Sequence, residues 1–361
     1  MISLYFHFPF CSHRCPYCHF LVLSNKRGHK EKFLSALLKE WELRLSLIEG
    51  RKILSIYFGG GTPTLFVEGI QAILTRLRPS CEITVEANPE DITLDLVGCL
   101  KDIGVNRISI GVQSFNNALL RYLGRTHDSK GARQAVLSAW SAGIQNISID
   151  LMYDIPYQTC KIWEESIVQA CALPITHLSL YNLVFEPHTV FYNRRKALVS
   201  TLPTQEMSVK MIHFACIYCE KMGLHRYEIS SFGEPSIHNS GYWNGREFLG
   251  FGPSAFSYMG GKRFCNTSDF NTYLLMLEKG NVPIDFEEQL DPLASLHERL
   301  IIGLRLMKGV EIDSFPPVTK EILVELEREG LLIYDKPHLF LSEKGCLFYD
   351  SIAERLVLLS E

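Results

Sequence analysis

Six short apolar runs, separated by helix-like patterns, constrain the fold of this chain more than any other feature. Each run is rich in Ile, Val, Leu, Tyr or Phe and fits a buried parallel strand. Alternation of strands and helices predicts right-handed βαβ units around a parallel sheet. The predicted strands are Ser3–Phe8, Ile53–Phe58, Glu82–Ala87, Arg107–Val112, Asn146–Met152 and His177–Val184. The predicted helices between and after them are Lys32–Ile48, Phe66–Leu77, Leu94–Ile103, Lys130–Ala142, Ile162–Ala172 and Glu206–Met222.

The pattern changes in the second half of the chain. Residues 225–275 are rich in Gly, Asn, Ser and aromatics and have few regular periods. An amphipathic helix over Leu293–Met307 and a second over Lys320–Glu329 follow, and short strands at Leu331–Tyr334 and Leu339–Leu341 resemble a winged-helix module. We therefore expect an α/β array over residues 1–190, an extension over 191–287 and a small C-terminal domain over 288–361.

Composition and charge exclude several classes of protein. Apolar residues make up 47% and charged residues 21% of the 361-residue chain, which excludes disorder and fibrous folds. The formal net charge of −4 disfavours a protein built to hold nucleic acid. Residues 1–10 lack a basic stretch and a cleavage site, and no apolar run is long enough to span a membrane. We expect a cytoplasmic protein with reduced thiols.

The chain has 11 cysteines, and three of them form a Cys-x-x-x-Cys-x-x-Cys motif directly after the first predicted strand. Cys11, Cys15 and Cys18 could hold a four-iron cluster and leave one iron without a protein ligand. A zinc ion is the alternative, with His7, His13 or His19 as fourth ligand. Cys216 and Cys219 lie within a predicted helix and are expected to be core thiols. The remaining cysteines are scattered and are expected to be buried: Cys81, Cys99, Cys160, Cys171, Cys265 and Cys346.

Polar or Gly-rich residues stand at the carboxyl ends of the next predicted strands. Ligands of parallel α/β arrays bind at these ends. The second strand ends in Gly59-Gly60-Gly61-Thr62-Pro63-Thr64, where glycine allows close approach of a ligand to the backbone. Glu86, Gln113 and Asp150 follow on the third, fourth and fifth strands. Because buried carboxylates and amides need partners, this set indicates a shared polar ligand.

With these features the chain resembles the radical S-adenosylmethionine superfamily, whose members use the same three-Cys spacing. Tyr17 is the aromatic residue that the superfamily usually has before the last Cys. The resemblance implies that residues 1–190 form a partial (β/α)6 barrel of the TIM type. It also implies that the three cysteines hold a [4Fe-4S] cluster, whose open iron binds the amino and carboxylate groups of S-adenosylmethionine.

More specific motifs resemble the HemN/HemW family of that superfamily, in the same order and through nearly the whole chain. They are Tyr5-Phe6-His7-Phe8-Pro9-Phe10-Cys11, Gly-Gly-Gly-Thr-Pro-Thr, Glu-x-Asn-Pro, Gly-Val-Gln-Ser-Phe and Leu-Gly-Arg-x-His. The resemblance implies that S-adenosylmethionine is contacted by Tyr5, Gly60, Gly61, Thr62, Glu86, Gln113, Arg125 and Asp150. The chain departs from the family at Asp154-Ile155-Pro156, where Gly-Leu-Pro is usual, and this puts the path of that loop in doubt.

Three features separate the two branches of the family. The oxygen-independent coproporphyrinogen III oxidases typically have a fourth Cys where this chain has Phe20, and they carry an N-terminal extension for which the cysteines at 11–18 leave no room. His238-Asn239-Ser240-Gly241-Tyr242-Trp243 resembles the H-N-x-x-Y-W motif of the heme chaperones. An imidazole can ligate heme iron, and Tyr242 and Trp243 offer flat apolar surfaces to a porphyrin. Without the resemblance, the same residues favour a different interpretation, in which His238 and Asn239 cap a turn and the aromatics belong to the core.

The resemblance therefore implies a heme chaperone that binds heme, a [4Fe-4S] cluster and S-adenosylmethionine. It would pass heme to acceptor proteins such as respiratory enzymes, with contact at the inner face of a respiratory membrane, and it allows a homodimer. The alternative is a radical enzyme that decarboxylates coproporphyrinogen III oxidatively to protoporphyrinogen IX. A radical enzyme that modifies tRNA is disfavoured by the net charge and by the lack of a basic RNA-binding module.

Overall fold

The six predicted strands lie side by side, in chain order, in the middle of one sheet of the computed structural model, which describes residues 1–24, 28–77, 79–312, 317–335 and 337–357. All six run parallel. They are β1 (Ile2–Phe8), β4 (Ile53–Gly60), β5 (Glu82–Ala87), β6 (Arg107–Gln113), β7 (Asn146–Tyr153) and β8 (His177–Asn182). The predicted fold class, an α/β partial barrel, is confirmed.

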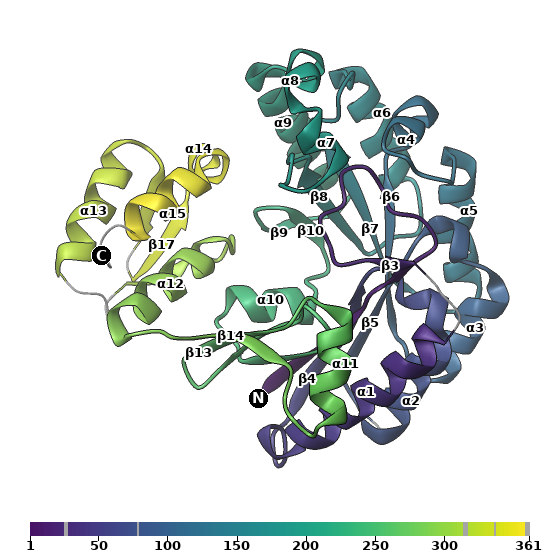
Figure 1. The fold of residues 1–361 in the computed structure, drawn as a ribbon. Helices are drawn as coiled ribbons and strands as arrows, with labels where there is room; N and C mark the ends of the chain where they lie inside the picture. The colour runs from purple at the N-terminus through teal and green to yellow at the C-terminus, as the bar shows by residue number, and fades with distance from the viewer. Residues whose placement is uncertain (25–27, 78, 313–316, 336, 358–361) are drawn as a thin grey trace.

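Helices connect these strands and cover one side of the sheet (Figure 1). They are α1 (His29–Arg44), α2 (Val67–Leu77), α3 (Leu94–Asp102), α4 (Asn117–Tyr122), α5 (Ser129–Ser141) and α6 (Cys160–Cys171). The helices begin where a side chain satisfies free backbone N–H groups: Thr93, Asn116, Asp128 and Thr159 cap α3 to α6. After α3 and α5 the chain turns through Gly104 (φ 100°) and Gly143 (φ 90°), as their sequence pattern predicts.

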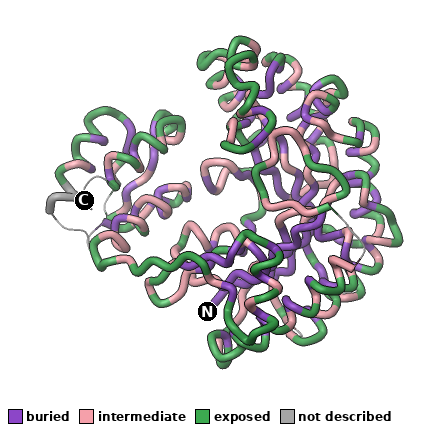
Figure 2. Tube along the Cα trace, viewed as in Figure 1, coloured by how far each residue is buried: buried purple, intermediate pink, exposed green. Residues whose placement is uncertain are grey.

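The two faces of the parallel strands differ in chemistry. In β1, Leu4, Phe6 and Phe8 are fully buried and belong to the hydrophobic core beneath the helices. The alternating residues Ser3, Tyr5 and His7 are polar, and the other strands of the array repeat this pattern. Figure 2 shows the strands as buried and the outer sides of the helices as exposed. The concave side of the array is therefore lined by polar side chains.

The region expected to have few regular elements, residues 225–275, is instead well ordered and extends the sheet at both edges. Strands β10 (Ser231–Gly233) and β9 (Arg226–Glu228) continue it antiparallel beyond β8. Strand β11 (Phe248–Phe251) pairs parallel with β1, and three antiparallel strands follow: β12 (Phe256–Met259), β13 (Lys262–Asn266) and β14 (Ile284–Gln289). These strands are too short to show a period, which is why the pattern missed them. Helices α10 (Ile237–Trp243) and α11 (Phe270–Glu278) lie in the same region.

The C-terminal segment has a hydrophobic core of its own, with Leu300, Leu326 and Ile352 fully buried in it. Helix α12 (Pro292–Leu304) leads to a three-stranded sheet in the order β15 (Val310–Glu311), β17 (His338–Leu341), β16 (Leu332–Asp335). Helices α13 (Pro317–Arg328), α14 (Glu343–Leu347) and α15 (Tyr349–Val357) complete it. The helix, helix and hairpin occur as predicted, and the domain limits at 190 and 287 stay a prediction.

Two short helices, one long helix and two short strands are also present: α7 (Val190–Asn193), α8 (Arg195–Leu198), α9 (Gln205–Lys221), β2 (Phe10–Cys11) and β3 (Leu23–Ser24). Cys219, on α9, is fully buried in the main core and Cys216 packs against that core, as predicted. Cys99 is exposed, which contradicts the expectation of a buried thiol, because it lies on the solvent side of α3. In the part of the chain that the structure describes, no helix is long and apolar enough to cross a membrane.

Candidate functional site

The three cysteines of the motif lie on one loop at the carboxyl end of β1. Cys11 ends β2, and Cys15 and Cys18 follow before β3, with Cys18 N–H donating to the Cys15 carbonyl at 3.1 Å. The loop reaches across to α7, where the carbonyl of Pro16 accepts a hydrogen bond from Phe191 N–H at 3.1 Å. The loop is thus held over the strand ends by contacts with distant parts of the chain.

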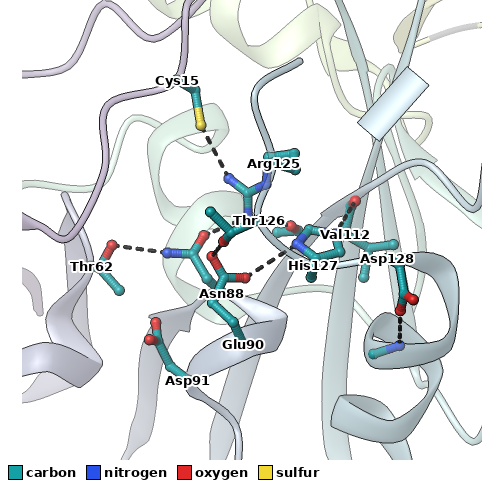
Figure 3. A network of polar contacts seen from close by, with 12 residues as sticks. Cys15, Thr62, Asn88, Glu90, Asp91, Val112, Arg125, Thr126, His127 and Asp128 are labelled. Atoms are coloured by element: carbon teal, nitrogen blue, oxygen red, sulfur yellow. Dashed lines mark hydrogen bonds and ion pairs between the residues drawn. The ribbon is translucent and has the colours of Figure 1, made fainter. Parts of the chain in front are cut away.

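A chain of hydrogen bonds joins this loop to the next strand ends (Figure 3). Thr62 Oγ1 lies 3.2 Å from Cys11 Sγ and accepts a hydrogen bond from Asn88 Nδ2 at 3.0 Å. Arg125 donates from Nη2 to Asn88 Oδ1 at 2.6 Å and to the Gly111 carbonyl at 2.9 Å, and from Nη1 to Cys15 Sγ at 3.6 Å. The network therefore holds the Arg125 guanidinium beside the Cys15 thiol and the Thr62 hydroxyl beside the Cys11 thiol.

The surroundings of the thiols suit a group that supplies positive charge. Burial raises the pKa of Cys11 to about 11 and also raises the pKa of Cys18. Thiolates at these positions therefore need a cation or a metal centre close by. In the described residues, no three Cys, His, Asp or Glu side chains are close enough for a single metal ion.

The histidines considered as zinc ligands are placed elsewhere. Both ring nitrogens of His7 have partners: Nδ1 lies 3.1 Å from Tyr5 Oη and Nε2 lies 3.2 Å from the Leu21 carbonyl. His13 and His19 are exposed on the loop.

The glycine turn after β4 packs tightly under the cysteine loop. Gly61 N–H donates to the Phe8 carbonyl and Thr62 N–H to the Phe10 carbonyl, both at 2.7 Å. Gly60 has φ 107°, and a Cβ there would lie 2.5 Å from the His7 ring. A side chain at Gly60 is therefore excluded by both conformation and space.

Two carboxyl groups predicted as ligands line the concave face. Glu86 accepts hydrogen bonds from Tyr57 Oη at 2.8 Å and from Gly60 N–H at 3.1 Å. Burial, opposed by the Tyr57 hydrogen bond, raises the pKa of Glu86 to about 7. Asp150 accepts a hydrogen bond from Ser109 Oγ at 3.4 Å, and burial raises its pKa to about 6. Each carboxyl can therefore exchange a proton near neutral pH.

Gln113 and Tyr5 complete the set of predicted ligands. Gln113 ends β6 in the left-handed region, with φ 66°, a conformation that costs a non-glycine residue roughly 1–2 kcal/mol. Such strain concentrates at functional sites. Tyr5 lies opposite Tyr57 in the register of β1 and β4, and their rings are stacked with centroids 6.1 Å apart.

Asp154 explains how the chain departs from the family's Gly-Leu-Pro. The residue adopts φ 59°, the conformation that glycine would favour. Its carboxylate accepts hydrogen bonds from Asn182 Nδ2 at 2.8 Å and Ser208 Oγ at 2.6 Å. The left-handed turn is therefore present without glycine, and two hydrogen bonds hold it.

The His-Asn-x-x-Tyr-Trp motif forms α10, at the opposite end of the strands from the cysteine loop. Glu82, the first residue of β5, accepts hydrogen bonds from the backbone N–H groups of Ile237 at 2.9 Å and His238 at 2.8 Å. Ser55, near the start of β4, lies 2.9 Å from His238 Nδ1. Ser55 pairs with Glu82 in the sheet register, so α10 packs against the amino ends of the strands.

His238 is the most constrained residue of this motif. It is 1% exposed, and its Nε2 lies 2.9 Å from Tyr242 Oη, so both ring nitrogens take part in hydrogen bonds. Burial lowers the pKa of His238 to about 3, and the charges of Arg246 and Arg107 add to this effect. His238 is therefore a neutral, internal imidazole that fastens α10 to the sheet.

The other motif residues lie nearer the surface. Asn239 N–H donates to Ser236 Oγ at 3.2 Å in the cap of α10, and Tyr242 packs edge-on against Phe248. Trp243 is half-buried at the end of α10. The guanidinium of Arg305 lies 4.3 Å from the centroid of its ring.

The structure adds residues that the list of predicted ligands omits. Asn88 connects Thr62 to Arg125, and Glu90 Oε2 lies 3.2 Å from Nδ1 of His127, two residues after Arg125. Asn88 and His127 lie in the motifs Glu-x-Asn-Pro and Leu-Gly-Arg-x-His quoted above, so the sequence contained a signal for these two residues. Their partners lie too far away in the chain for the sequence to reveal them.

The fold and site define a radical S-adenosylmethionine protein, and residues 5–168 match the family model of the radical SAM superfamily. The chain is 34% identical to the "Heme chaperone HemW" of Lactococcus lactis subsp. lactis (strain IL1403), over 99% of this chain and 97% of that protein. It is 33% identical to the protein of the same name from Bacillus subtilis (strain 168), over 98% of both. The chain belongs to the HemW family.

Among solved structures, coproporphyrinogen III oxidase (HemN) from Escherichia coli has the same fold. The TM-score is 0.85, and the alignment covers 99% of this chain and 90% of that one at 24% identity. This likeness concerns the fold.

The superfamily implies a [4Fe-4S] cluster and S-adenosylmethionine as bound groups. The residues present fit both. Three thiols lie on one loop, Arg125 supplies a positive charge beside Cys15, and the buried carboxyl groups of Glu86 and Asp150 lie on the concave face. Thiolates are the ligands that iron–sulfur clusters take.

Proposed function

We propose that this protein is a heme chaperone, which binds heme, a [4Fe-4S] cluster and S-adenosylmethionine and transfers heme to acceptor proteins such as respiratory enzymes. The observation that carries the proposal is the match of 34% identity over nearly the full length of a heme chaperone. The motif on α10 supports it, since this chain has the complete His-Asn-x-x-Tyr-Trp sequence.

In this proposal Cys11, Cys15 and Cys18 hold the cluster, with Arg125 and Thr62 beside their sulfurs. S-adenosylmethionine lies between the cysteine loop and the strand ends, in contact with Tyr5, Gly60, Gly61, Thr62, Glu86, Gln113, Arg125 and Asp150. When bound, the cluster supplies the open iron that takes the amino and carboxylate groups of S-adenosylmethionine. The guanidinium of Arg125 suits a carboxylate, and Glu86 and Asp150 suit hydroxyl or amino groups.

We place heme delivery in the cytoplasm, at the inner face of a respiratory membrane. This proposal is supported by the bacterial origin of the heme chaperones that match along nearly their whole length. A homodimer is part of the same proposal.

An anaerobic assay separates this function from an oxidase. The reconstituted chain is incubated with coproporphyrinogen III, S-adenosylmethionine and a reductant, and the products are resolved chromatographically. The proposal expects no protoporphyrinogen IX above the level of a Cys15→Ala control. Turnover that requires Cys15 would identify an oxidase and contradict it.

A further inference from the structure

A cavity of about 430 Å³ lies between the end of α10 and the C-terminal segment. Residues from α10, α12, β15 and β17 line it, among them Trp243, Arg299, Lys308, Glu311 and His338. Its volume is within the range of roughly 300–1,000 Å³ for small-molecule sites. It adjoins the motif helix but lies outside the cluster site at the other end of the strands.

The wall from α10 is a fixed aromatic surface. Arg305 lies over the Trp243 ring and is itself held by Glu228 Oε2 at 3.3 Å and Ser230 Oγ at 3.4 Å. The indole Nε1 of Trp243 is buried and, within the described residues, has no hydrogen-bond partner.

The opposite walls carry charges and an imidazole. Arg299 and Lys308 are exposed at the cavity, and Lys308 Nζ donates to Asn244 Oδ1 at 2.9 Å. His338 Nε2 lies 3.6 Å from Glu311 Oε1. A histidine whose second ring nitrogen faces a carboxylate has the arrangement common among metal-ligating histidines.

We propose that this cavity is the heme-binding site, with the iron ligated by His338 and the two propionates bound by Arg299 and Lys308. The inference rests on the proposed function and specifies where its ligand binds. Trp243 supplies the flat apolar surface on which the porphyrin packs. His238 does not reach the iron, because its two ring nitrogens are bound to Ser55 and Tyr242 inside the sheet.

The test is a titration of the cluster-free full-length chain with ferric heme and, separately, with metal-free protoporphyrin IX, followed by absorbance. His338→Ala is expected to weaken heme binding about tenfold or more, a change of 1.4 kcal/mol per tenfold, and to alter the heme spectrum. Binding of metal-free porphyrin should be unchanged, because that porphyrin has no iron to ligate. His225→Ala, at an exposed histidine between α9 and β9, is the matched control.

A second variant tests the carboxylate contacts. Arg299→Glu combined with Lys308→Glu is expected to weaken both porphyrins alike, about tenfold. If wild type binds heme and His338→Ala binds it with equal affinity and an unchanged spectrum, the assignment of this cavity is wrong while the proposed function stands. If wild type binds no heme, the proposed function itself fails.

Discussion

Arg125 Nη1 lies 3.6 Å from Cys15 Sγ, while Nη2 of the same guanidinium donates to Asn88 and to the Gly111 carbonyl. One cation thus contacts a sulfur of the cysteine loop and the ends of two strands. Burial raises the pKa values of Cys11 and Cys18, and the charge of Arg125 is among the groups that oppose this effect.

Arg125→Met should therefore reduce retention of the cluster. The substitution keeps the length of the side chain and removes its charge and its three hydrogen bonds. We expect iron and sulfide per chain after anaerobic reconstitution to fall several-fold and S-adenosylmethionine binding to weaken. Arg133→Met, at an exposed arginine of α5, should retain full iron and sulfide. Equal iron content in both variants would exclude the role given to Arg125.

Asp154 offers a test of the departure from the family's glycine. Asp154→Ala removes the hydrogen bonds from Asn182 and Ser208 and keeps the left-handed conformation, so we expect a loss of about 2 kcal/mol in the free energy of unfolding. Asp154→Gly loses the same bonds but relieves about 1 kcal/mol of backbone strain. Urea unfolding should rank wild type above Gly above Ala. Equal values for Ala and Gly would mean that strain at φ 59° is unimportant.

Glu86 should make stability depend on pH. Its pKa of about 7 in the folded chain exceeds the value of about 4.3 in an unfolded chain, so the folded state binds more protons between these values. The free energy of unfolding contributed by this group therefore falls as pH rises from about 4.3 to 7 and stays low above that. Glu86→Gln removes this dependence.

The prediction is checked by urea unfolding of the cluster-free protein at pH 5 and pH 8. The free energy of unfolding of Glu86→Gln minus that of wild type should be larger at pH 8 than at pH 5. Glu42→Gln, at an exposed position of α1, is the control. A wild-type-to-variant difference that is identical at the two pH values would contradict the raised pKa.

His238 should matter for stability. His238→Ala leaves a cavity and removes the hydrogen-bond partner of the Ser55 and Tyr242 hydroxyls. We therefore expect a loss of about 2–4 kcal/mol in the free energy of unfolding. His213→Ala, on the exposed side of α9, should change it by less than about 0.5 kcal/mol. Unfolding curves of His238→Ala that overlay wild type would show that its hydrogen bonds do not fasten α10.

Local patterns in the sequence predict much of the fold and part of the site. The six strands follow from apolar runs, and the cysteine loop follows from its spacing after the first run. The Gly60 turn, Glu86 and Asp150 reach one concave face because parallel strands align their carboxyl ends.

What the sequence could not predict depends on contacts between distant residues. Asn88 joins Thr62 and Arg125, and each of these is tens of residues away. Helix α10 lies at the amino ends of the strands because Glu82 caps it and Ser55 bonds His238, each more than 150 residues earlier. The His-Asn-x-x-Tyr-Trp motif shows that a histidine is present at position 238. Only the packing of α10 shows that its imidazole is buried.

Transfer of heme to an acceptor protein is the activity that defines a heme chaperone, and it can be measured directly. The purified, reconstituted chain is loaded with heme, separated from free heme and mixed under reducing, anaerobic conditions with an apo-form heme protein of a respiratory enzyme. We predict that heme absorbance moves from the chain to the acceptor and that the acceptor gains activity faster than with an equal amount of heme carried by albumin. A chain that binds no heme, or that transfers it no faster than albumin, would contradict the account.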